Sequence, residues 1–233
     1  MELKNRMNIR IKTTLGSNDL GLDIKEYIVI LIDVLRASST ITTLFQKNAK
    51  GVHSLKNLED TYALKNRIKD SILIGERSGI KIDNFKFGNS PDHIYNHDFT
   101  DKEIIFTSSN FSRILTNYKD AKILLVGCIL NAKAVAQHIK NIMTQNDKIL
   151  LVEVGTGESF SIEDNLGARI ISHYLIPNKI PEQSEIEEIL LKSPNGRYLS
   201  KIGYKKDVIF CSQLNKFDCI PIRKSDYTFG VIH

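Results

Sequence analysis

Short runs of β-branched and other apolar residues alternate along the chain with stretches in which apolar residues recur every three or four positions. The runs predict strands and the stretches predict helices. The predicted strands cover residues 27–33, 51–55, 71–74, 103–107, 122–126 and 148–154. The predicted helices between them cover residues 39–47, 58–69, 110–118, 132–143 and 162–175. This alternation predicts an α/β fold, a three-layer α/β/α sandwich with a mostly parallel, mixed central sheet.

The two ends of the chain show less regular patterns. Residues 8–14 predict an extra strand, and another strand is predicted near residues 207–211. Residues 204–222 contain two strand-like runs, which fit either an edge hairpin or a return to the main sheet. No linker or low-complexity run divides the 233 residues. A single domain over residues 1–233 is therefore expected.

One long stretch, residues 75–99, has no sustained periodicity and is rich in Gly, Asn, Asp and His. A connection of this length in a compact domain is usually functional. Within it, Ser90 followed by Pro91 predicts a short helix, because Ser favours the N-cap and Pro favours the first turn. His93 and His97 lie in the same stretch and are kept as candidate site residues.

Composition and charge narrow the class of ligand. The net charge of +5 favours anions, but the 32 Lys and Arg residues are interleaved with 27 acidic ones, which favours a small anionic ligand over nucleic acid. The apolar runs are far shorter than the roughly 20 residues that span a bilayer, so no membrane association is expected. Three cysteines without CxxC spacing are typical of reduced, buried thiols in the cytoplasm.

Polar residues follow the carboxyl ends of most of the predicted strands. Ligands bind at those ends in open parallel sheets, so a binding crevice along one rim is expected. The segments concerned are residues 33–40, 75–79, 107–110, 127–131 and 155–164.

Several residues in these segments suit anion binding. Asp33 ends an apolar strand, where a carboxylate needs a cation, a metal or hydrogen-bond donors, although it could also brace a neighbouring loop. Ser38 and Ser39 begin a predicted helix and could bind a phosphate oxygen or simply cap the helix. Arg36 and Arg77 offer planar guanidinium groups suited to phosphate, sulfonate or carboxylate, but each could equally be a surface ion-pair partner.

Three further acidic residues are candidate metal ligands. Glu76, Glu163 and Asp164 supply the hard oxygen ligands that Mg²⁺ prefers. Glu163 and Asp164 also lie in the first turn of a predicted helix, where acidic side chains are favourable without any metal. The chain lacks the phosphate-loop, dinucleotide and HExxH motifs, which removes the commonest nucleotide and zinc assignments.

The order of the motifs indicates a family. They are IDVLRASSTI at residues 32–41, GERSGIKIDNFKFGNSP at 75–91, TSSNFSR at 107–113, GCILNAKAVA at 127–136 and GTGESFSIEDNL at 155–166, with GYKKDVIFCSQLNKFDCIPI at 203–222. Together they closely resemble the 2-phosphosulfolactate phosphatase family of coenzyme M biosynthesis, nearly from end to end.

The resemblance implies hydrolysis of 2-phosphosulfolactate to sulfolactate and phosphate, with Mg²⁺ as the cofactor. The catalytic residues that it implies are Asp33, Arg36, Glu76, Arg77 and Asp164. The metal ligands that it implies are Asp33, Glu76, Glu163 and Asp164. The substrate-binding residues that it implies are Ser38, Ser39, Lys81, Asn89, Thr107, Asn110, Arg113, Asn131 and Thr156. The guanidinium and ammonium groups of Arg36, Arg77, Lys81 and Arg113 would offset the charge of the substrate.

The chain also departs from the family pattern. The family usually has glycine where this chain has Ser78 and Asn84, a Gly-Thr pair at Phe111 and Ser112, and a second glycine near Glu158. Gly167 and Arg169 also replace the small Cys and Gly residues expected after the acidic pair. These changes remodel loops around the substrate, so a related phosphate ester is a further candidate.

Two other classes of function stay open at this point. An isochorismatase-like hydrolase would use Cys128 as a thiol nucleophile, although no Lys is convincingly placed to activate it. A catalytically silent homologue would bind nucleic acid or an anionic metabolite without turning it over. An aspartyl-phosphate mechanism is disfavoured because Leu35 stands where that mechanism needs a second Asp. The sequence is compatible with a homodimer.

Overall fold

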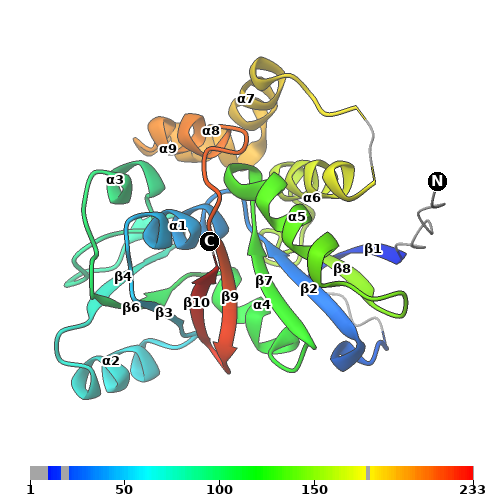
Figure 1. The fold of residues 1–233 in the computed structure, drawn as a ribbon. Helices are drawn as coiled ribbons and strands as arrows, with labels where there is room; N and C mark the ends of the chain where they lie inside the picture. Colours follow the sequence, from blue (N-terminus) through cyan, green and yellow to red (C-terminus); the bar gives the residue numbers. More distant parts are fainter. Residues whose placement is uncertain (1–9, 17–20, 177–178, 233) are drawn as a thin grey trace, which may run out of the picture.

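The strands of the computed structural model, which describes residues 10–16, 21–176 and 179–232, pair into one sheet with helices on both faces (Figure 1). This arrangement confirms the predicted α/β sandwich with a mixed sheet. In the described residues the sheet has ten strands in the order β1-β8-β2-β7-β9-β10-β3-β6-β4-β5. The strands are β1 Arg10–Leu15, β2 Tyr27–Ile32, β3 Gly51–Ser54, β4 Ile72–Arg77, β5 Ile80–Lys81, β6 Glu103–Thr107, β7 Ile123–Gly127, β8 Lys148–Glu153, β9 Ile220–Ser225 and β10 Thr228–Ile232.

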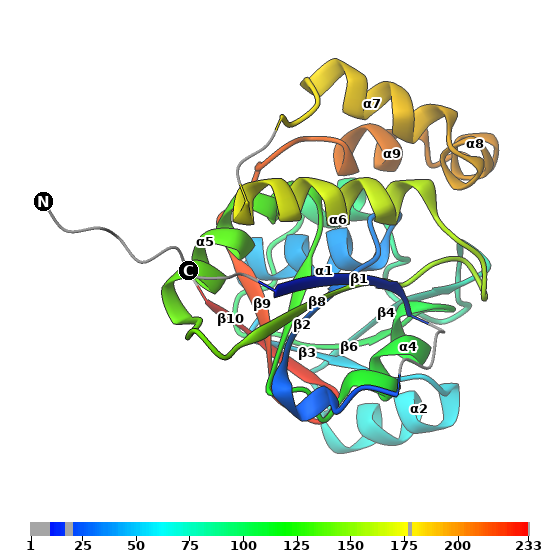
Figure 2. The same ribbon diagram turned by 90° about the vertical axis from the view of Figure 1, so that its right-hand side faces the viewer.

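The helices connect these strands and cover both faces of the sheet. The α-helices are α1 Ala37–Gln46, α2 Leu58–Arg67, α3 Pro91–Tyr95, α4 Phe111–Tyr118, α5 Ala132–Ile142, α6 Ile162–Leu175, α7 Gln183–Lys192, α8 Pro194–Lys201 and α9 Lys205–Cys211. Helices α7, α8 and α9 pack on one another as an outer group beyond α6 (Figure 2).

The sheet consists of two parallel groups that run in opposite directions. In one group β1, β8, β2 and β7 are parallel neighbours, and in the other β3, β6 and β4 are. The hairpin of β9 and β10 lies between the groups and is antiparallel to both β7 and β3. In a flat sheet the carboxyl ends of the two groups would therefore lie on opposite edges.

Sheet twist brings these ends back to the same side. Neighbouring strands rotate by roughly 20–25° relative to one another, so the six steps from β2 to β4 amount to about 120–150°. Strands of opposite topological direction then point broadly the same way, and the segments that follow β2, β4, β6 and β8 line one cavity. The expected crevice exists, but it depends on twist rather than on one uniformly parallel sheet.

The central strand β2 is apolar because both of its faces are covered. All six of its residues are buried. Val29 and Leu31 pack into the core shared with α1 and α4, whereas Ile28 and Ile30 pack into the core shared with α5 and α6. A strand buried on both faces reads as a continuous apolar run instead of an alternating one.

The C-terminal third of the chain differs from the sequence prediction. Residues 207–211, predicted as a strand, belong to helix α9, and the hairpin lies further along in β9 and β10. The VIFC run favours a strand by composition, but Val208 and Cys211 lie three positions apart and both are buried, which is helical spacing. The predicted first strand is found as β1, although its residues 8 and 9 lie outside the described residues. The short helix predicted from Ser90 is α3, with Ser90 as its N-cap, as expected.

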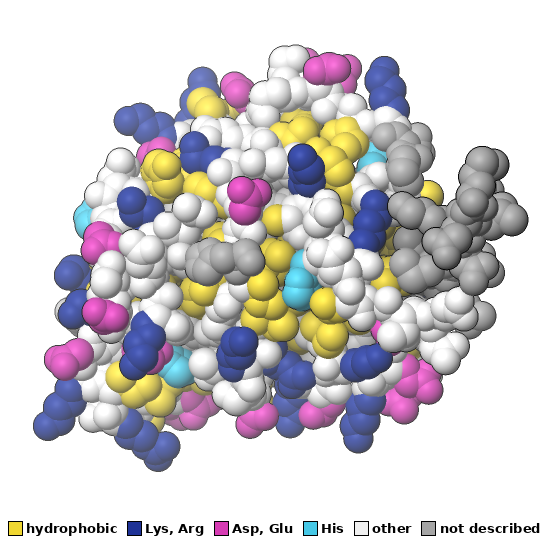
Figure 3. Space-filling view, viewed as in Figure 1, with side chains coloured by type: hydrophobic (Ala, Val, Ile, Leu, Met, Phe, Trp, Pro, Cys, Tyr) yellow, Lys and Arg dark blue, Asp and Glu magenta, His cyan; other side chains and the backbone are white. Residues whose placement is uncertain are grey.

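The surface charges and the burial of the cysteines agree with what the composition predicted. On the face drawn in Figure 3, Lys and Arg side chains are scattered among acidic and uncharged ones. Cys128, Cys211 and Cys219 are free and buried, as predicted. Among the described residues, no helix has both the length and the apolar character that crossing a bilayer requires.

The close approach of β4 and β6 gives the first testable prediction. A Cβ atom on Gly75 would lie 2.3 Å from the backbone oxygen of Thr107, so Gly75→Ala should force the two strands apart. We expect a loss of about 1–3 kcal/mol of stability, measured by urea unfolding. Gly230→Ala is the matched control, because its Cβ would meet only the flexible side chain of Lys224. Equal losses in the two variants would contradict the strand contact.

Candidate active site

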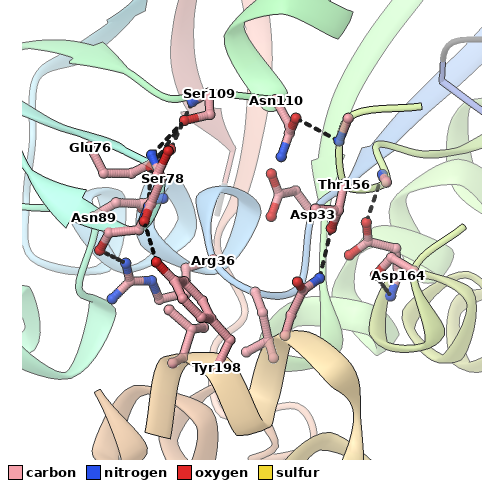
Figure 4. Close-up of a pocket in the computed structure, with 17 residues that line it drawn as sticks. Asp33, Arg36, Glu76, Ser78, Asn89, Ser109, Asn110, Thr156, Asp164 and Tyr198 are labelled. Carbon is pink, nitrogen blue, oxygen red and sulfur yellow. Dashed lines mark hydrogen bonds between the residues drawn. The ribbon is translucent and has the colours of Figure 1, made fainter. Parts of the chain in front are cut away.

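A cavity of about 460 Å³ opens where the loops after β2, β4, β6 and β8 meet helix α8. Figure 4 shows Asp33 near its centre, with Glu76, Ser109 and Arg36 to one side and Thr156 and Asp164 to the other. Of the residues predicted from the sequence, this cavity brings together Asp33, Arg36, Glu76, Asn89, Asn110, Thr156 and Asp164.

Asp33 lies directly after β2 and is only 7% exposed. One carboxylate oxygen, Oδ1, accepts a hydrogen bond from the backbone N–H of Ala37 at 3.1 Å. Burial raises the pKa of Asp33 to about 7, and the negative charges of Glu76 and Glu163 act in the same direction. A carboxyl group with a pKa close to neutrality can both hold and release a proton there, as a general acid or base must.

Asp164, in the first turn of α6, holds two of the loops together. Its Oδ1 accepts from the N–H of Val34 at 2.8 Å, and its Oδ2 accepts from the N–H of Gly155 at 2.9 Å. The pKa of Asp164 is nevertheless raised, by burial and then by the charges of Asp33 and Glu163. The loops after β2 and β8 are thus joined through one buried carboxylate.

Glu76 plays the same part on the other side of the cavity. Its Oε1 accepts from the N–H of Ser109 at 2.7 Å, and its Oε2 accepts from the N–H of Gly79 at 2.6 Å. The turn at Gly79 has φ +79°, a conformation that favours glycine. The β4–β5 turn is thereby fixed against the loop after β6.

Arg36 is held by a network that the sequence did not reveal. Its guanidinium donates to Asp207 Oδ2 at 2.7 Å and to the carbonyl oxygen of Gly79 at 2.7 Å, and it lies 4.3 Å from the centre of the Tyr204 ring. The side chains of Arg36 and Asp207 are each 2% exposed. Asp207 also accepts from Ser90 Oγ at 2.7 Å. This ion pair connects helix α9 to the loop after β2.

The structure corrects the expectation that four cationic side chains offset the charge of the substrate. Arg77 donates to the carbonyl oxygens of Glu76 and Lys56 and to Thr107 Oγ1, while Lys81 donates to the carbonyl of Phe85. Arg113 donates to the carbonyl of Gly157. None of these three cations lines the cavity, although two of the residues whose carbonyls bind them, Glu76 and Gly157, do.

Four of the predicted substrate-binding residues also lie away from the cavity lining. Ser38 accepts from the N–H of Asp33, and Ser39 donates to the carbonyl of Val34, so both hydroxyls brace the turn between β2 and α1. Asn131 is fully buried and bonds to the backbone of Cys128 and Val126. Thr107 is buried under Arg77. These polar groups satisfy the backbone or neighbouring side chains instead of facing the cavity.

Two buried polar side chains near the site have oxygens without a hydrogen-bond partner among the described residues. Both carboxylate oxygens of Glu163 are unpaired although the residue is 1% exposed, and it does not line the cavity. Asn89 lines the cavity, and its Oδ1 is likewise unpaired. Buried acceptors normally find a donor, so these oxygens indicate a missing donor or cation.

The predicted metal ligands do not form a ready-made cage. Within the described ranges, no group of three or more His, Cys, Asp or Glu side chains is arranged to hold a metal ion. Asp33, Glu76 and Asp164 line the cavity. Both carboxylate oxygens of Asp164 and of Glu76, however, already accept hydrogen bonds from backbone N–H groups.

The residues of the alternative assignments lie outside the cavity lining. Cys128 is fully buried, and burial raises the pKa of its thiol, which disfavours a thiolate nucleophile. The rings of His93 and His97 pack against Phe87 and each other. Neither histidine lines the cavity.

The sequence missed the residues that helix α8 contributes to the cavity. Asn195, Tyr198 and Leu199 form one wall. The pair Ser193 and Pro194 is an N-cap signal that would have predicted the helix, since Ser193 Oγ accepts from the N–H of Gly196. Nothing in the sequence indicated where that helix lies.

Comparison with known proteins identifies the family. The 2-phosphosulpholactate phosphatase family model matches residues 17–226. The chain belongs to this family. The predicted resemblance is thus confirmed, and with it the assignment to the phosphoric monoester hydrolases.

Named relatives of the phosphatase family agree over most of the chain. A probable 2-phosphosulfolactate phosphatase of Carboxydothermus hydrogenoformans is 34% identical over 206 residues, covering 83% of this chain and 84% of the relative. The 2-phosphosulfolactate phosphatase of Methanocaldococcus jannaschii is 33% identical over 216 residues, covering 85% of this chain and 90% of the relative. The residues matched by the family model include all the loops that form the cavity.

The raised pKa of Asp33 predicts a stability change in Asp33→Asn. At pH values between 3.8, the ordinary pKa of the group, and about 7, the folded protein holds the Asp33 proton and the unfolded chain has lost it. The contribution of Asp33 to stability is therefore full at low pH and is lost as the pH rises through 7. An asparagine cannot ionise, so the thermal midpoint of the variant should increasingly exceed that of the wild type from about pH 4 to about pH 7 and the difference should stay level above that, by roughly 2–4 °C for each kcal/mol. A constant difference across this range would show that Asp33 is ionised in the folded protein throughout.

The buried Arg36–Asp207 pair predicts a large effect on stability. Asp207→Ala leaves the guanidinium buried without its charge partner, so we expect a loss of about 3–5 kcal/mol in urea unfolding. Glu188→Ala is the control, because Glu188 pairs with Lys192 on the surface and its loss should not be resolvable. If the two variants unfold alike, the buried pair does not hold α9 in place.

Proposed function

We propose that this chain is a magnesium-dependent phosphatase that hydrolyses 2-phosphosulfolactate, or a closely related small anionic phosphate ester, to the free hydroxy acid and phosphate. The observation that carries the proposal is the cavity with Asp33 at its centre, in a chain of this family. The M. jannaschii relative, named a 2-phosphosulfolactate phosphatase, supports the choice of substrate.

The charge of the cavity supports a requirement for a cation. Asp33, Glu76 and Asp164 line it, and Arg36, the one guanidinium among the described residues that lines it, is already paired with Asp207. A substrate bearing phosphate, carboxylate and sulfonate groups would be repelled by these carboxylates alone. A divalent cation reverses this balance, because it attracts both the carboxylates and the phosphoryl oxygens.

The donor set fits Mg²⁺ in particular. This ion prefers hard oxygen ligands and usually takes only one or two protein carboxylates, with waters and substrate phosphate completing its shell. Asp33 and Asp164 are the carboxylates that we assign to it, since each Asp164 oxygen keeps a second lone pair beside the N–H bond that it accepts. Glu163 and Glu76 are close enough to contribute charge. A hydrated ion also supplies O–H donors, which the unpaired oxygens of Glu163 and Asn89 lack. When bound, Mg²⁺ would polarise the phosphoryl group and lower the barrier to attack at phosphorus.

The residues of the chain account for the remaining steps. A carboxylate oxygen of Asp33 can accept the proton of the attacking water as the new P–O bond forms and the ester P–O bond breaks. The same proton can then pass to the departing alkoxide oxygen. Arg36, oriented by Asp207 and Gly79, would direct its remaining N–H groups at an anionic oxygen of the substrate. No covalent intermediate is needed.

The positions that depart from the family pattern support a conserved class of substrate. Among these positions Ser78 lines the cavity, whereas Asn84 and Glu158 do not, and Phe111 is buried in the core. Ser78 contributes its backbone carbonyl to Tyr198. A related ester therefore stays a second candidate, because Ser78 is the one of these positions that lines the cavity. The cytoplasmic location, the absence of a nucleic-acid partner, the single domain and a homodimer stay predictions from the sequence.

Phosphate release from a panel of small phosphate esters, with Mg²⁺ and with chelator, tests the proposal. We expect turnover of 2-phosphosulfolactate that disappears with chelator, and a fall of at least about 100-fold in kcat for Asp33→Asn, the range typical of general acid–base catalysis. Mg²⁺ should also raise the thermal midpoint of the wild type more than that of Asp33→Asn.

Asp120→Asn is the control for these measurements, because Asp120 is an exposed residue outside the cavity lining. Full activity of Asp33→Asn would exclude Asp33 from the chemistry, and full activity in chelator would exclude the metal.

A further inference from the structure

Helix α8 forms one wall of the cavity and is linked to both of its sides. Asn195 Nδ2 donates to Thr156 Oγ1 at 2.7 Å, and the Tyr198 hydroxyl donates to the carbonyl oxygen of Ser78 at 3.0 Å. Figure 4 shows Tyr198 rising from α8 toward Ser78 on one side, with Thr156 on the other. The helix thus spans the opening between the loops after β4 and β8.

The position of α8 is fixed independently of these two bonds. Leu199 is 4% exposed and packs into the core shared with α5 and α6. Gly196 lies so close to Leu190 that a Cβ atom would be 1.8 Å from the Leu190 carbonyl oxygen. Gly79, across the cavity, sits against Tyr198 and Leu199. Because packing holds the helix, its polar side chains are free to exchange partners.

This wall differs from the carboxylate side of the cavity in charge. The side chains that α8 presents are an amide, a phenol and an apolar group, whereas the carboxylates come from other elements: Asp33 after β2, Glu76 in β4 and Asp164 in α6. A phosphoryl group bound with a cation belongs beside the carboxylates. The rest of the ester must then lie where no carboxylate repels it, and α8 provides such a surface.

The two α8 donors are suited to an anionic tail. Asn195 is half-buried and Tyr198 is 44% exposed, so a ligand can reach both. Their present acceptors, a hydroxyl and a carbonyl, are neutral. Hydrogen bonds to a charged oxygen are roughly twice as strong as bonds between neutral groups, so sulfonate or carboxylate oxygens would displace Thr156 and Ser78 as acceptors.

We propose that Asn195 and Tyr198 recognise the anionic end of the substrate that lies away from the phosphoryl group, which makes α8 the element that selects among phosphate esters. This inference rests on the proposed function for the identity of the ester. Uncharged donors bind the tail without placing a second positive charge in the cavity. Such a charge would compete with Mg²⁺ for the carboxylates.

Calorimetric binding of sulfolactate, which carries the tail without the phosphoryl group, tests the inference in the presence of Mg²⁺. Asn195→Asp places a negative charge against the tail, and we expect sulfolactate to bind at least about tenfold more weakly. Inorganic phosphate, the second probe, should bind within about twofold of the wild type. Tyr198→Phe removes a single donor and should weaken sulfolactate by a smaller factor.

Asn146→Asp is the matched control, because Asn146 is an exposed amide outside the cavity lining. It introduces the same charge and should bind both probes as the wild type does. Thermal midpoints of all variants check that each is folded. If Asn195→Asp does not fold, the sulfolactate affinity of Tyr198→Phe decides the test.

Three results would overturn the inference: unchanged sulfolactate binding in the folded variants, an equal loss for phosphate and sulfolactate, or no sulfolactate binding by the wild type. Phosphate release is measured separately. A wild type that binds sulfolactate through Asn195 but releases no phosphate would reject the proposed function and leave the tail site standing.

Discussion

The twist of the sheet around the β9–β10 hairpin is the constraint on which the site depends. The hairpin separates two parallel groups that run in opposite directions, so only the accumulated rotation between β2 and β4 brings Asp33 and Glu76 to the same cavity. The last strands of the chain therefore determine the geometry of residues near its beginning. A site assembled in this way requires the whole sheet to form before any of its parts can act.

Buried carboxylates hold the loops together at this meeting point. Asp164 and Glu76 each bind two backbone N–H groups from different loops, which satisfies donors that would otherwise be unpaired. The same burial places several negative charges close together and raises the pKa values of Asp33 and Asp164. The arrangement is rigid in its backbone but electrostatically unfavourable, as expected where function opposes stability.

The C-terminal helices complete the cavity and tie it to the rest of the fold. Asp207 on α9 holds Arg36, and α8 supplies the wall opposite the carboxylates. Neither helix carries a residue that stands out as chemically unusual in the sequence. Their contribution is positional, because a guanidinium and two neutral donors acquire a role only when packing aims them at one place.

The sequence by itself determined the alternation of strands and helices, the family, and the acidic residues of the cavity, because these depend on local periodicity and on short motifs such as those containing Asp33, Glu76 and Asp164. Only the tertiary structure decided which cations face the cavity: Arg77, Lys81 and Arg113 bind backbone carbonyls and do not line it, whereas Arg36 does. It also decided that residues 207–211 form a helix and that α8 is a wall. The physical reason is that a long side chain or an amphipathic segment chooses its partner from the groups that the fold brings within reach, and those groups lie far away along the chain.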